Sequence, residues 1–179
     1  MIMTTDPHKR PVAVVGRGDH LTARLLRRLI ENPVEVLTPC AAALKGDDSG
    51  CYRAVVLENF DTNSAGLSPC GAARWGLSRR ADVTVVGLDD GEGRRLAGES
   101  GLPVYAYSDG RPQADLTAKQ VTLREGRLEF EALTQRELLR VRVPLLYGPR
   151  LYDYLAALAA AVAVGVPLSE AAARLGAEN

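Results

Sequence analysis

The sequence predicts an α/β domain in which a mostly parallel sheet is flanked by helices and is continued by an antiparallel β extension. Two observations carry this prediction. Up to residue 107, short continuous apolar runs alternate with stretches of helical periodicity, which is typical of strands buried on both faces of a parallel sheet. From residue 118 to 145, apolar and polar residues alternate, which is typical of antiparallel strands with one wet face.

The first part of the chain contains five candidate strands, at residues 12–15, 34–37, 54–57, 83–88 and 104–107. The spacing of leucines predicts a helix from Leu21 to Ile30, and weaker patterns predict helices at 71–80 and 92–100. The segments 45–50 and 59–70 have the composition of loops. Because strands and helices alternate, we expect a three-layer arrangement of the Rossmann-like or P-loop type.

The second part begins with three candidate antiparallel strands, at residues 118–123, 128–133 and 139–145. In the last of these strands, the odd-numbered apolar residues are expected to face the core, whereas Arg140 and Arg142 face solvent. An alanine-rich helix follows from Leu151 and ends near Gly165. Ser169 is the expected N-cap of a last short helix that ends near residue 176.

The composition limits the classes of partner. Lysine plus arginine and aspartate plus glutamate both number 22, so no global field favours nucleic acid or an anionic membrane. No run of 18 apolar residues exists, and no signal peptide is recognisable, so we expect no membrane segment and a cytoplasmic protein. Cys40, Cys51 and Cys70 form no C-x-x-C pair and are expected to be reduced thiols. We expect residues 1–10 to be a disordered N-terminus and residues 11–179 to form a single domain.

A glycine turn between the first strand and the first helix has the layout of a phosphate-binding loop. A Rossmann fingerprint would continue from Gly16 and Gly18 to a third glycine, but that position is Leu21. A Walker-type loop needs lysine and then serine or threonine after its last glycine, and here Asp19 and His20 follow. An ordinary strand-to-helix turn remains the alternative interpretation.

A second cluster of polar residues follows the candidate strand at 83–88. Asp89, Asp90 and Glu92 lie just after that strand, at the sheet edge where parallel α/β proteins usually bind ligands. Such carboxylates could contact a metal ion or a ribose. The alternative is a solvated turn whose acids favour the N-terminus of the following helix. His8 and His20 have no serine or cysteine nucleophile at a recognisable spacing, so an acyl-transfer triad has no support.

These segments resemble the central, ATP-binding domain of the Mur ligases, most closely the type that adds the third amino acid to UDP-N-acetylmuramoyl-dipeptide. The segment ADVTVVGLDDGEGRRLA, residues 81–97, resembles a strand of the family that ends in an N-x-D-D turn. The family's strand, G-x-(F/H)-N-x-x-N turn and alanine-rich helix are similar to VRVPLLYGPRLYDYLAALAAAVAVGVPLSEAAARL. With VAVVGRGDHLTARLL as a degenerate loop and AVVLE as the strand before a magnesium-binding glutamate, the resemblance covers most of residues 11–176.

The resemblance implies a degenerate nucleotide site at Gly16, Gly18, Asp19, His20, Asp89, Asp90 and Asp153, with Glu58 as a magnesium ligand. The family's loop lysine and threonine are replaced by Asp19 and His20. The adenine-contacting asparagine of its N-x-D-D turn corresponds to Gly87. The second asparagine of its later turn corresponds to Asp153, and Arg150 lies near the first. The lysine that becomes carbamylated has no counterpart. Because each departure removes a nucleotide or metal contact, a pseudoenzyme without catalytic residues is expected. ATP and magnesium are the family's cofactors, but neither is expected to bind the isolated chain.

Three hypotheses about function follow. The first is a non-catalytic relative of the Mur ligases that acts as a binding or regulatory subunit in peptidoglycan biosynthesis. The second is one piece of a split ATP-dependent acid–amino-acid ligase, in which a partner protein supplies the missing domains; a homo-oligomer is a further option. The third is a Rossmann-like binder of a small anion, using the backbone amides of Gly18 and Asp19.

Overall fold

A computed structural model describes residues 6, 9–16, 20–38, 51–58, 76–145 and 150–177 of the chain. Its strands form one eight-stranded sheet in the order β2-β1-β3-β4-β5-β6-β7-β8. The strands are β1 (Val12–Val15), β2 (Val34–Leu37), β3 (Ala54–Leu57), β4 (Thr84–Gly87), β5 (Val104–Asp109), β6 (Leu116–Arg124), β7 (Arg127–Leu133) and β8 (Leu138–Pro144). The expectations for the loops at 45–50 and 59–70, and for most of residues 1–10, fall outside the described residues.

The sheet is mostly parallel, with antiparallel strands at one edge, as the sequence predicts. Strands β1 to β5 pair in parallel, and β6, β7 and β8 pair antiparallel. One boundary differs from the prediction, because β6 also pairs in parallel with the end of β5, from Tyr107↔Leu116 to Asp109↔Ala118. Alternation of apolar and polar residues reports which face a side chain occupies, not the direction of the strand, so it could not reveal this pairing.

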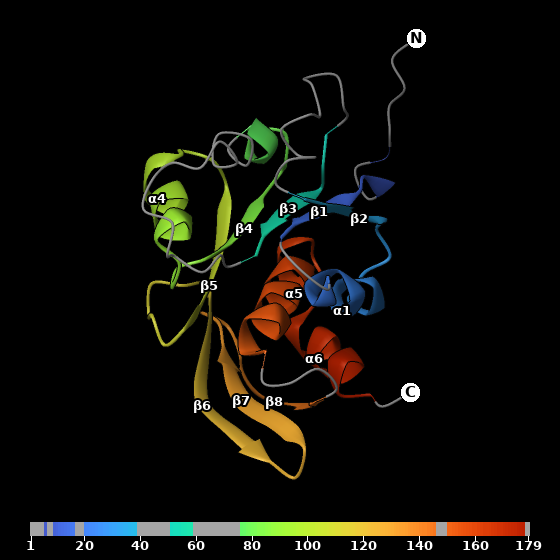
Figure 1. Cartoon of the computed structure of the whole chain (residues 1–179), viewed down its shortest axis with the longest axis vertical. Helices are drawn as coiled ribbons and strands as arrows, with labels where there is room; N and C mark the ends of the chain where they lie inside the picture. Colours follow the sequence, from blue (N-terminus) through green and yellow to red (C-terminus); the bar gives the residue numbers. More distant parts are fainter. Residues whose placement is uncertain are drawn as a thin grey trace.

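Helices cover both faces of the parallel part (Figure 1). Helices α1 (Leu21–Leu29), α5 (Leu151–Ala163) and α6 (Leu168–Gly176) contribute to the apolar cluster on one face, and α4 (Gly91–Glu99) contributes Leu96 to the cluster on the other. Residues 76–78 of the predicted helix at 71–80 form a helical turn, and the rest up to residue 75 is not described. The expectation that Ser169 caps the last helix is wrong. The N-cap is Pro167, two residues before Ser169, and its φ of −57° suits a helix start.

Alternate residues of each buried strand face opposite helix layers. In β3, Ala54 and Val56 belong to the cluster formed with α1 and α5, whereas Val55 and Leu57 face the α4 side. The register predicted for β8 is confirmed. Its buried residues Val141 and Val143 alternate with exposed arginines, and the flanking Leu139 and Leu145 pack partly buried against the same core.

The first and last helices cap each other with arginines. Arg174 of α6 donates from Nη1 to the carbonyl oxygen of Leu29 at the end of α1, at 2.6 Å. In return, Arg28 of α1 donates from Nη2 to the carbonyl oxygens of Arg174 and Ala177 at the end of α6, at 3.2 and 2.7 Å. Carbonyls of a last helical turn lack partners within the helix, so each arginine satisfies groups that the other helix leaves open.

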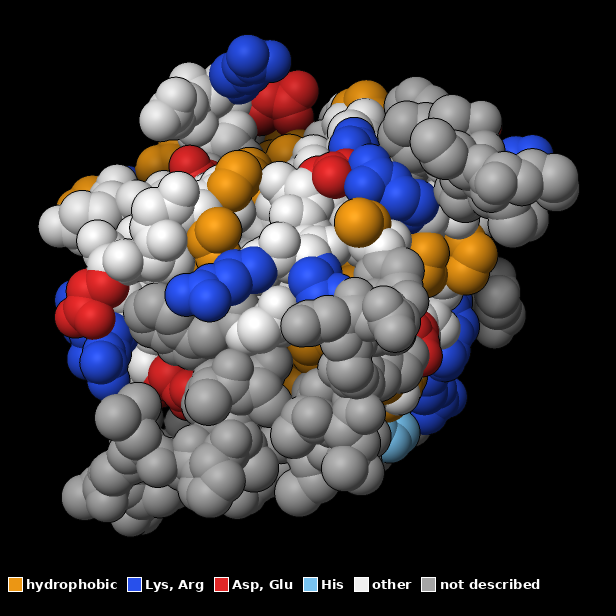
Figure 2. Space-filling model, turned by 90° about the horizontal axis from the view of Figure 1, so that it is seen from above, with side chains coloured by type: hydrophobic (Ala, Val, Ile, Leu, Met, Phe, Trp, Pro, Cys, Tyr) orange, Lys and Arg blue, Asp and Glu red, His pale blue; other side chains and the backbone are white. Residues whose placement is uncertain are grey.

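The charges of the described surface are mixed. Seen from above, basic and acidic side chains lie interspersed with small apolar areas (Figure 2). On the outer face of the antiparallel extension, Glu129 pairs with both Arg140 and Arg142. This distribution matches the equal numbers of basic and acidic residues in the sequence. No helix in the described part of the chain is long and apolar enough to cross a membrane.

Candidate functional site

The predicted site residues that the structure describes lie along the carboxyl edge of the parallel strands. Gly16 directly follows β1, Glu58 follows β3, and Asp89 and Asp90 follow β4. Because these strands run in the same direction, their carboxyl ends share one edge of the sheet. Helices α1 and α5 add their N-terminal ends, so His20 and Asp153 join this group. The two remaining predicted residues, Gly18 and Asp19, lie outside the described residues.

The carboxylate of Glu58 lies directly against the backbone of Gly16. A Cβ atom at position 16 would stand 1.6 Å from Oε2 of Glu58, so any larger residue here would require the end of the Glu58 side chain to move. The backbone N–H of Glu58 donates to the carbonyl oxygen of Val15 at 3.1 Å, which holds the ends of β1 and β3 together. Glu58 is only 9% exposed. A nearly buried carboxyl group, contributed by the end of β3, therefore lies beside Gly16 at the end of β1.

A second carboxyl group, Asp153, is held from two sides. The hydroxyl of Thr22 in α1 donates to Oδ1 of Asp153 at 3.0 Å. Arg150 donates from Nε to Oδ2 at 2.6 Å and from Nη2 to Oδ1 at 3.2 Å, so it grips both oxygens. Thr22 is completely buried and was not among the predicted site residues. Its position in the first turn of the helix after a glycine turn was the only sequence signal for it.

The charges of the neighbouring groups affect the pKa of Glu58. Burial is the main reason that the pKa of Glu58 is raised, and the charge of Asp153 raises it further. The hydroxyl of Thr22 and the nearby Arg150 and His20 oppose these effects, but the pKa of Glu58 is raised on balance. In the structure, the one hydroxyl proton of Thr22 is donated to Asp153. Protonation of Glu58 removes its negative charge. This lowers the free-energy cost of burying the side chain and ends its repulsion by Asp153.

His20 has an unusual backbone conformation. It precedes α1 with φ 58° and ψ 33°, the left-handed region that few residues other than glycine adopt, and its side chain does not cap the helix. Such a conformation costs about 1 kcal/mol and is often found at functional sites. At His20, the structure therefore departs from an ordinary capped helix start.

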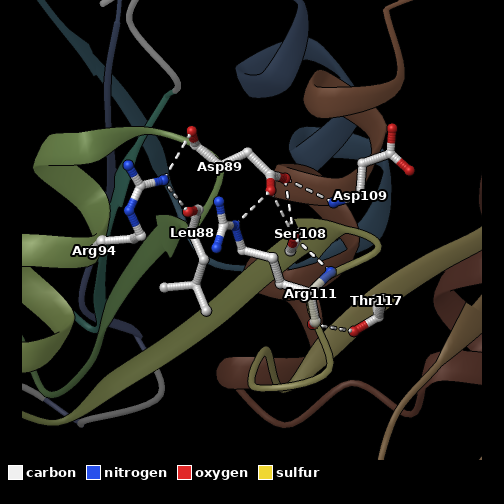
Figure 3. Close-up of polar contacts among 7 residues, drawn as sticks. All are labelled: Leu88, Asp89, Arg94, Ser108, Asp109, Arg111 and Thr117. Atoms are coloured by element: carbon white, nitrogen blue, oxygen red, sulfur yellow. Dashed lines mark hydrogen bonds and ion pairs between the residues drawn. The ribbon is translucent and has the colours of Figure 1, made fainter.

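The two aspartates after β4 have local partners (Figure 3). Asp89 accepts from the hydroxyl of Ser108 at 2.8 and 3.0 Å, from the backbone N–H of Asp109 at 2.7 Å and from Nε of Arg111 at 3.2 Å. Asp90 is the N-cap of α4, and its Oδ1 accepts from the backbone N–H of Glu92 at 3.1 Å. These contacts agree with the interpretation in which the acidic pair organises a turn and a helix start.

The same turn is fixed to α4 by backbone contacts. Arg94 donates from Nη1 to the carbonyl oxygens of Leu88 at 2.8 Å and Asp89 at 3.1 Å (Figure 3). A Cβ at position 93 would lie 2.1 Å from the carbonyl oxygen of Gly87, so Gly93 allows the helix to approach the end of β4. Position 87 is itself a glycine, so it has no side chain that could contact a nucleotide base.

The arrangement does not fit a magnesium ion. Glu58, Asp153 and Thr22 supply the oxygen atoms that hard cations prefer. However, both oxygens of Asp153 are engaged by the guanidinium of Arg150, which brings its own positive charge to the cluster. Within the described residues, no group of three or more histidine, cysteine, aspartate or glutamate side chains could hold a metal.

Comparison with known proteins finds similar structures but no similar sequence. The sequence matches no family model, and a search of curated proteins finds no match. Among solved structures, MurF from Acinetobacter baumannii matches with a TM-score of 0.75 at 15% identity, over 96% of this chain and 46% of that one.

Two further ligases match in the same way. A UDP-N-acetylmuramoyl-L-alanyl-D-glutamate–2,6-diaminopimelate ligase gives a TM-score of 0.74 at 17% identity, over 95% of this chain and 47% of the ligase. A pseudomurein peptide ligase type C from Methanothermus fervidus gives 0.71 at 12% identity, over 98% and 50%. The chain thus spans about half the length of each ligase. These similar scores single out no member of the group. The chain therefore has the Mur ligase fold over nearly its whole described length.

Proposed function

We propose that this chain is a non-catalytic relative of the Mur ligases that acts as a binding or regulatory subunit in peptidoglycan synthesis. The shared fold supports the relation to cell-wall peptide ligases. One observation supports the non-catalytic part, namely that both oxygens of Asp153, at a position where the family has an asparagine, are engaged by the guanidinium of Arg150.

The charges at this edge disfavour a polyphosphate. A phosphate bound near the loop would meet Glu58 and, in the sequence, Asp19 at the position where phosphate chemistry uses lysine. At about 4 Å and an effective dielectric constant near 20, one charge pair is worth about 4 kcal/mol. Even a solvent-discounted loss of about 3 kcal/mol weakens binding by roughly 100-fold. A micromolar nucleotide site would weaken to a dissociation constant on the order of 100 µM by this effect alone.

The contacts to the nucleotide base are also weakened. Gly87 has no side chain, and Gly93 lies against its carbonyl oxygen. The side chain of Asp153 is committed to Arg150 and Thr22. A base at this edge would therefore have to break an ion pair before it gained a hydrogen bond from these positions.

Titration calorimetry with MgATP tests the loss of nucleotide binding. We expect no measurable heat of binding and no ADP release with the wild-type chain. Asp19→Lys should restore affinity only in part, because Gly87 and the paired Asp153 still offer the base little. Tight binding of MgATP by the wild type, with affinity lost in Asp19→Ala, would show that the loop is a working nucleotide site and would overturn the proposal.

The regulatory part needs a separate assay. The purified chain is added to UDP-N-acetylmuramoyl-peptide ligases from the same cell, and their rates of ADP release are measured. We expect a change in the KM or rate of one of these ligases. A mixture in which ligation requires this chain, and fails with Asp19→Ala, would instead favour a split ligase. Unchanged kinetics with every such ligase would contradict a regulatory role in this pathway.

A further inference from the structure

A small pocket lies between α1, α5, α6 and the end of β8, and its volume is about 110 Å³. None of the candidate site residues that the structure describes lines this pocket. We propose that it binds a carboxylate that carries a short branched alkyl group, either as a free acid or as the C-terminal residue of a peptide. This inference goes beyond the proposed function because it concerns a different site and a different ligand.

One face of α1 forms a side of the pocket, and the sequence of the helix explains its character. The residues of α1 that line the pocket follow one another at helical spacing, so they share one face: Leu21, Arg24, Leu25 and Arg28. Thr22 lies about 100° further round the helix and bonds to Asp153 instead. The two leucines are buried, whereas Arg24 is exposed. This face therefore offers both apolar surface and positive charge to a ligand.

The remaining sides of the pocket are apolar. Leu175 of α6 is only 1% exposed. The hydroxyl of Tyr154 in α5 donates to the carbonyl oxygen of Pro144 at 2.8 Å, so these two polar groups of the lining residues already satisfy each other. A ligand would therefore gain free energy here by burying apolar groups. A cavity of roughly 150 Å³ can hold benzene, so this smaller pocket suits an alkyl group of about four or five carbon atoms.

The arginines favour a ligand with a negative charge. Arg28 donates from Nη2 to the carbonyl oxygens of Arg174 and Ala177, which are neutral groups. Because a guanidinium has five N–H donors, these two bonds leave donors for a ligand. Arg24 lies one turn earlier on the same face and adds a second positive charge. A carboxylate suits such a site, since the planar guanidinium can bond to both of its oxygens.

A ¹³C-methyl NMR titration of the whole chain, without nucleotide, measures the affinity and the location of binding together. The probes are 3-methylbutanoate, its neutral amide and acetyl-glycyl-leucine. The methyl signals of Leu25 and Leu175 report on the pocket. Those of Leu96, which belongs to the apolar cluster on the other face of the sheet, are an internal control.

Three variants test the role of the positive charges. Arg24→Gln and Arg28→Gln each remove one arginine of the pocket. Arg27→Gln is the matched control, because Arg27 lies on the same helix but donates to the carbonyl oxygen of Val34 and does not line the pocket. Arg28→Gln also removes helix-end hydrogen bonds, so Arg24→Gln, at an exposed position, decides the result if that variant does not fold.

We expect saturable shifts at Leu25 and Leu175 with 3-methylbutanoate, and roughly tenfold weaker binding of the amide. Arg24→Gln and Arg28→Gln should each weaken binding of the acid by a similar factor, and Arg27→Gln should leave it unchanged. Binding of acetyl-glycyl-leucine at least as tight as that of the acid would assign the pocket to a peptide terminus, and binding of the acid alone would assign it to a free acid.

Two kinds of result would overturn the proposal. The first is that neither carboxylate gives saturable shifts at the leucines of the pocket. The second is equal affinity for the acid and the amide, or unchanged affinity in Arg24→Gln, because the arginines would then only cover the leucines with their methylene groups. None of these outcomes depends on MgATP or on a ligase, so failure here is distinguishable from failure of the proposed function.

Discussion

At the scale of single residues, Gly16 determines where the carboxyl group of Glu58 lies. The space that a methyl group would need at position 16 is filled by Oε2 of Glu58. Two residues that follow different strands, 42 positions apart in the sequence, are thus in direct contact. A substitution at either position should change the packing of the other residue.

Gly16→Ala should be destabilising by only about 1 kcal/mol or less, because the new methyl group must displace the end of the Glu58 side chain, and that end is flexible. Gly98→Ala is a matched control, since a Cβ at that position in α4 meets nothing within 4 Å. This control should be stabilising by about 0.5–1 kcal/mol, as expected for alanine in a helix. Urea denaturation measures both free energies of unfolding. Equal effects of the two substitutions would show that Glu58 does not lie against Gly16 in solution.

The raised pKa of Glu58 predicts a pH dependence of stability. The folded protein binds this proton more tightly than the unfolded chain, whose glutamate has an ordinary pKa of 4.5. The contribution of Glu58 is therefore fully present below the unfolded pKa and is lost as the pH rises through the folded pKa. Relative to Glu58→Gln, which cannot titrate here, the wild type should lose stability as the pH rises above the unfolded value of 4.5 and through the raised pKa of Glu58 in the folded protein. A parallel pair of stability curves would contradict the raised pKa.

Sequence reasoning found part of this site for a simple reason. Gly16 and Glu58 follow buried strands, and parallel strands bring such residues to one edge. The bond between Thr22 and Asp153 was not predictable, because it joins residues 131 positions apart and depends on how α1 packs beside α5. The grip of Arg150 on Asp153 was also missed, although the two residues are close in the sequence. Their spacing alone does not show that Arg150 engages both oxygens of Asp153.

At the scale of elements, the edge strand β8 offers a test of register. Val141 is 1% exposed, whereas the side chain of Arg140 is 60% exposed and shares Glu129 with Arg142. Val141→Asp should cost several kcal/mol because it buries a charge without a partner, and Arg140→Ala should change stability by about 0.5 kcal/mol or less. Thermal and urea denaturation measure the difference. Similar losses in both variants would mean that the strand is shifted by one residue.

Strand positions were predicted well because burial on two faces leaves a strong apolar signal. The start of α6 was misplaced because Ser169 has the right chemistry for a cap, but Pro167 fixes the backbone two residues earlier. The parallel pairing of β5 with β6 depends on side chains that fold the intervening loop back. The hydroxyl of Thr117 donates to the carbonyl oxygen of Arg111, and Asp115 accepts from the backbone N–H of Ala106. No periodicity encodes such contacts.

At the scale of the whole molecule, the exchange of arginines between α1 and α6 joins the beginning of the domain to its end. Arg174→Ala and Arg28→Ala should each lower the free energy of unfolding by about 1–2 kcal/mol, since each leaves helix-end carbonyls without a charged donor. A double-mutant cycle measured in urea should show coupling, because both residues join the same two helices. Strict additivity would indicate that the two caps act independently.

The same junction has a consequence for the rate at which the protein folds. The bond from Arg174 to Leu29 spans 145 residues, so it can form only after most of the chain has been ordered. Contacts between distant residues slow folding, and interactions that form after the transition state affect mainly the unfolding rate. Stopped-flow experiments on Arg174→Ala should therefore find refolding nearly as fast as in the wild type and unfolding several-fold faster. The pair of arginines would then slow unfolding, and so lengthen the time for which the domain stays folded.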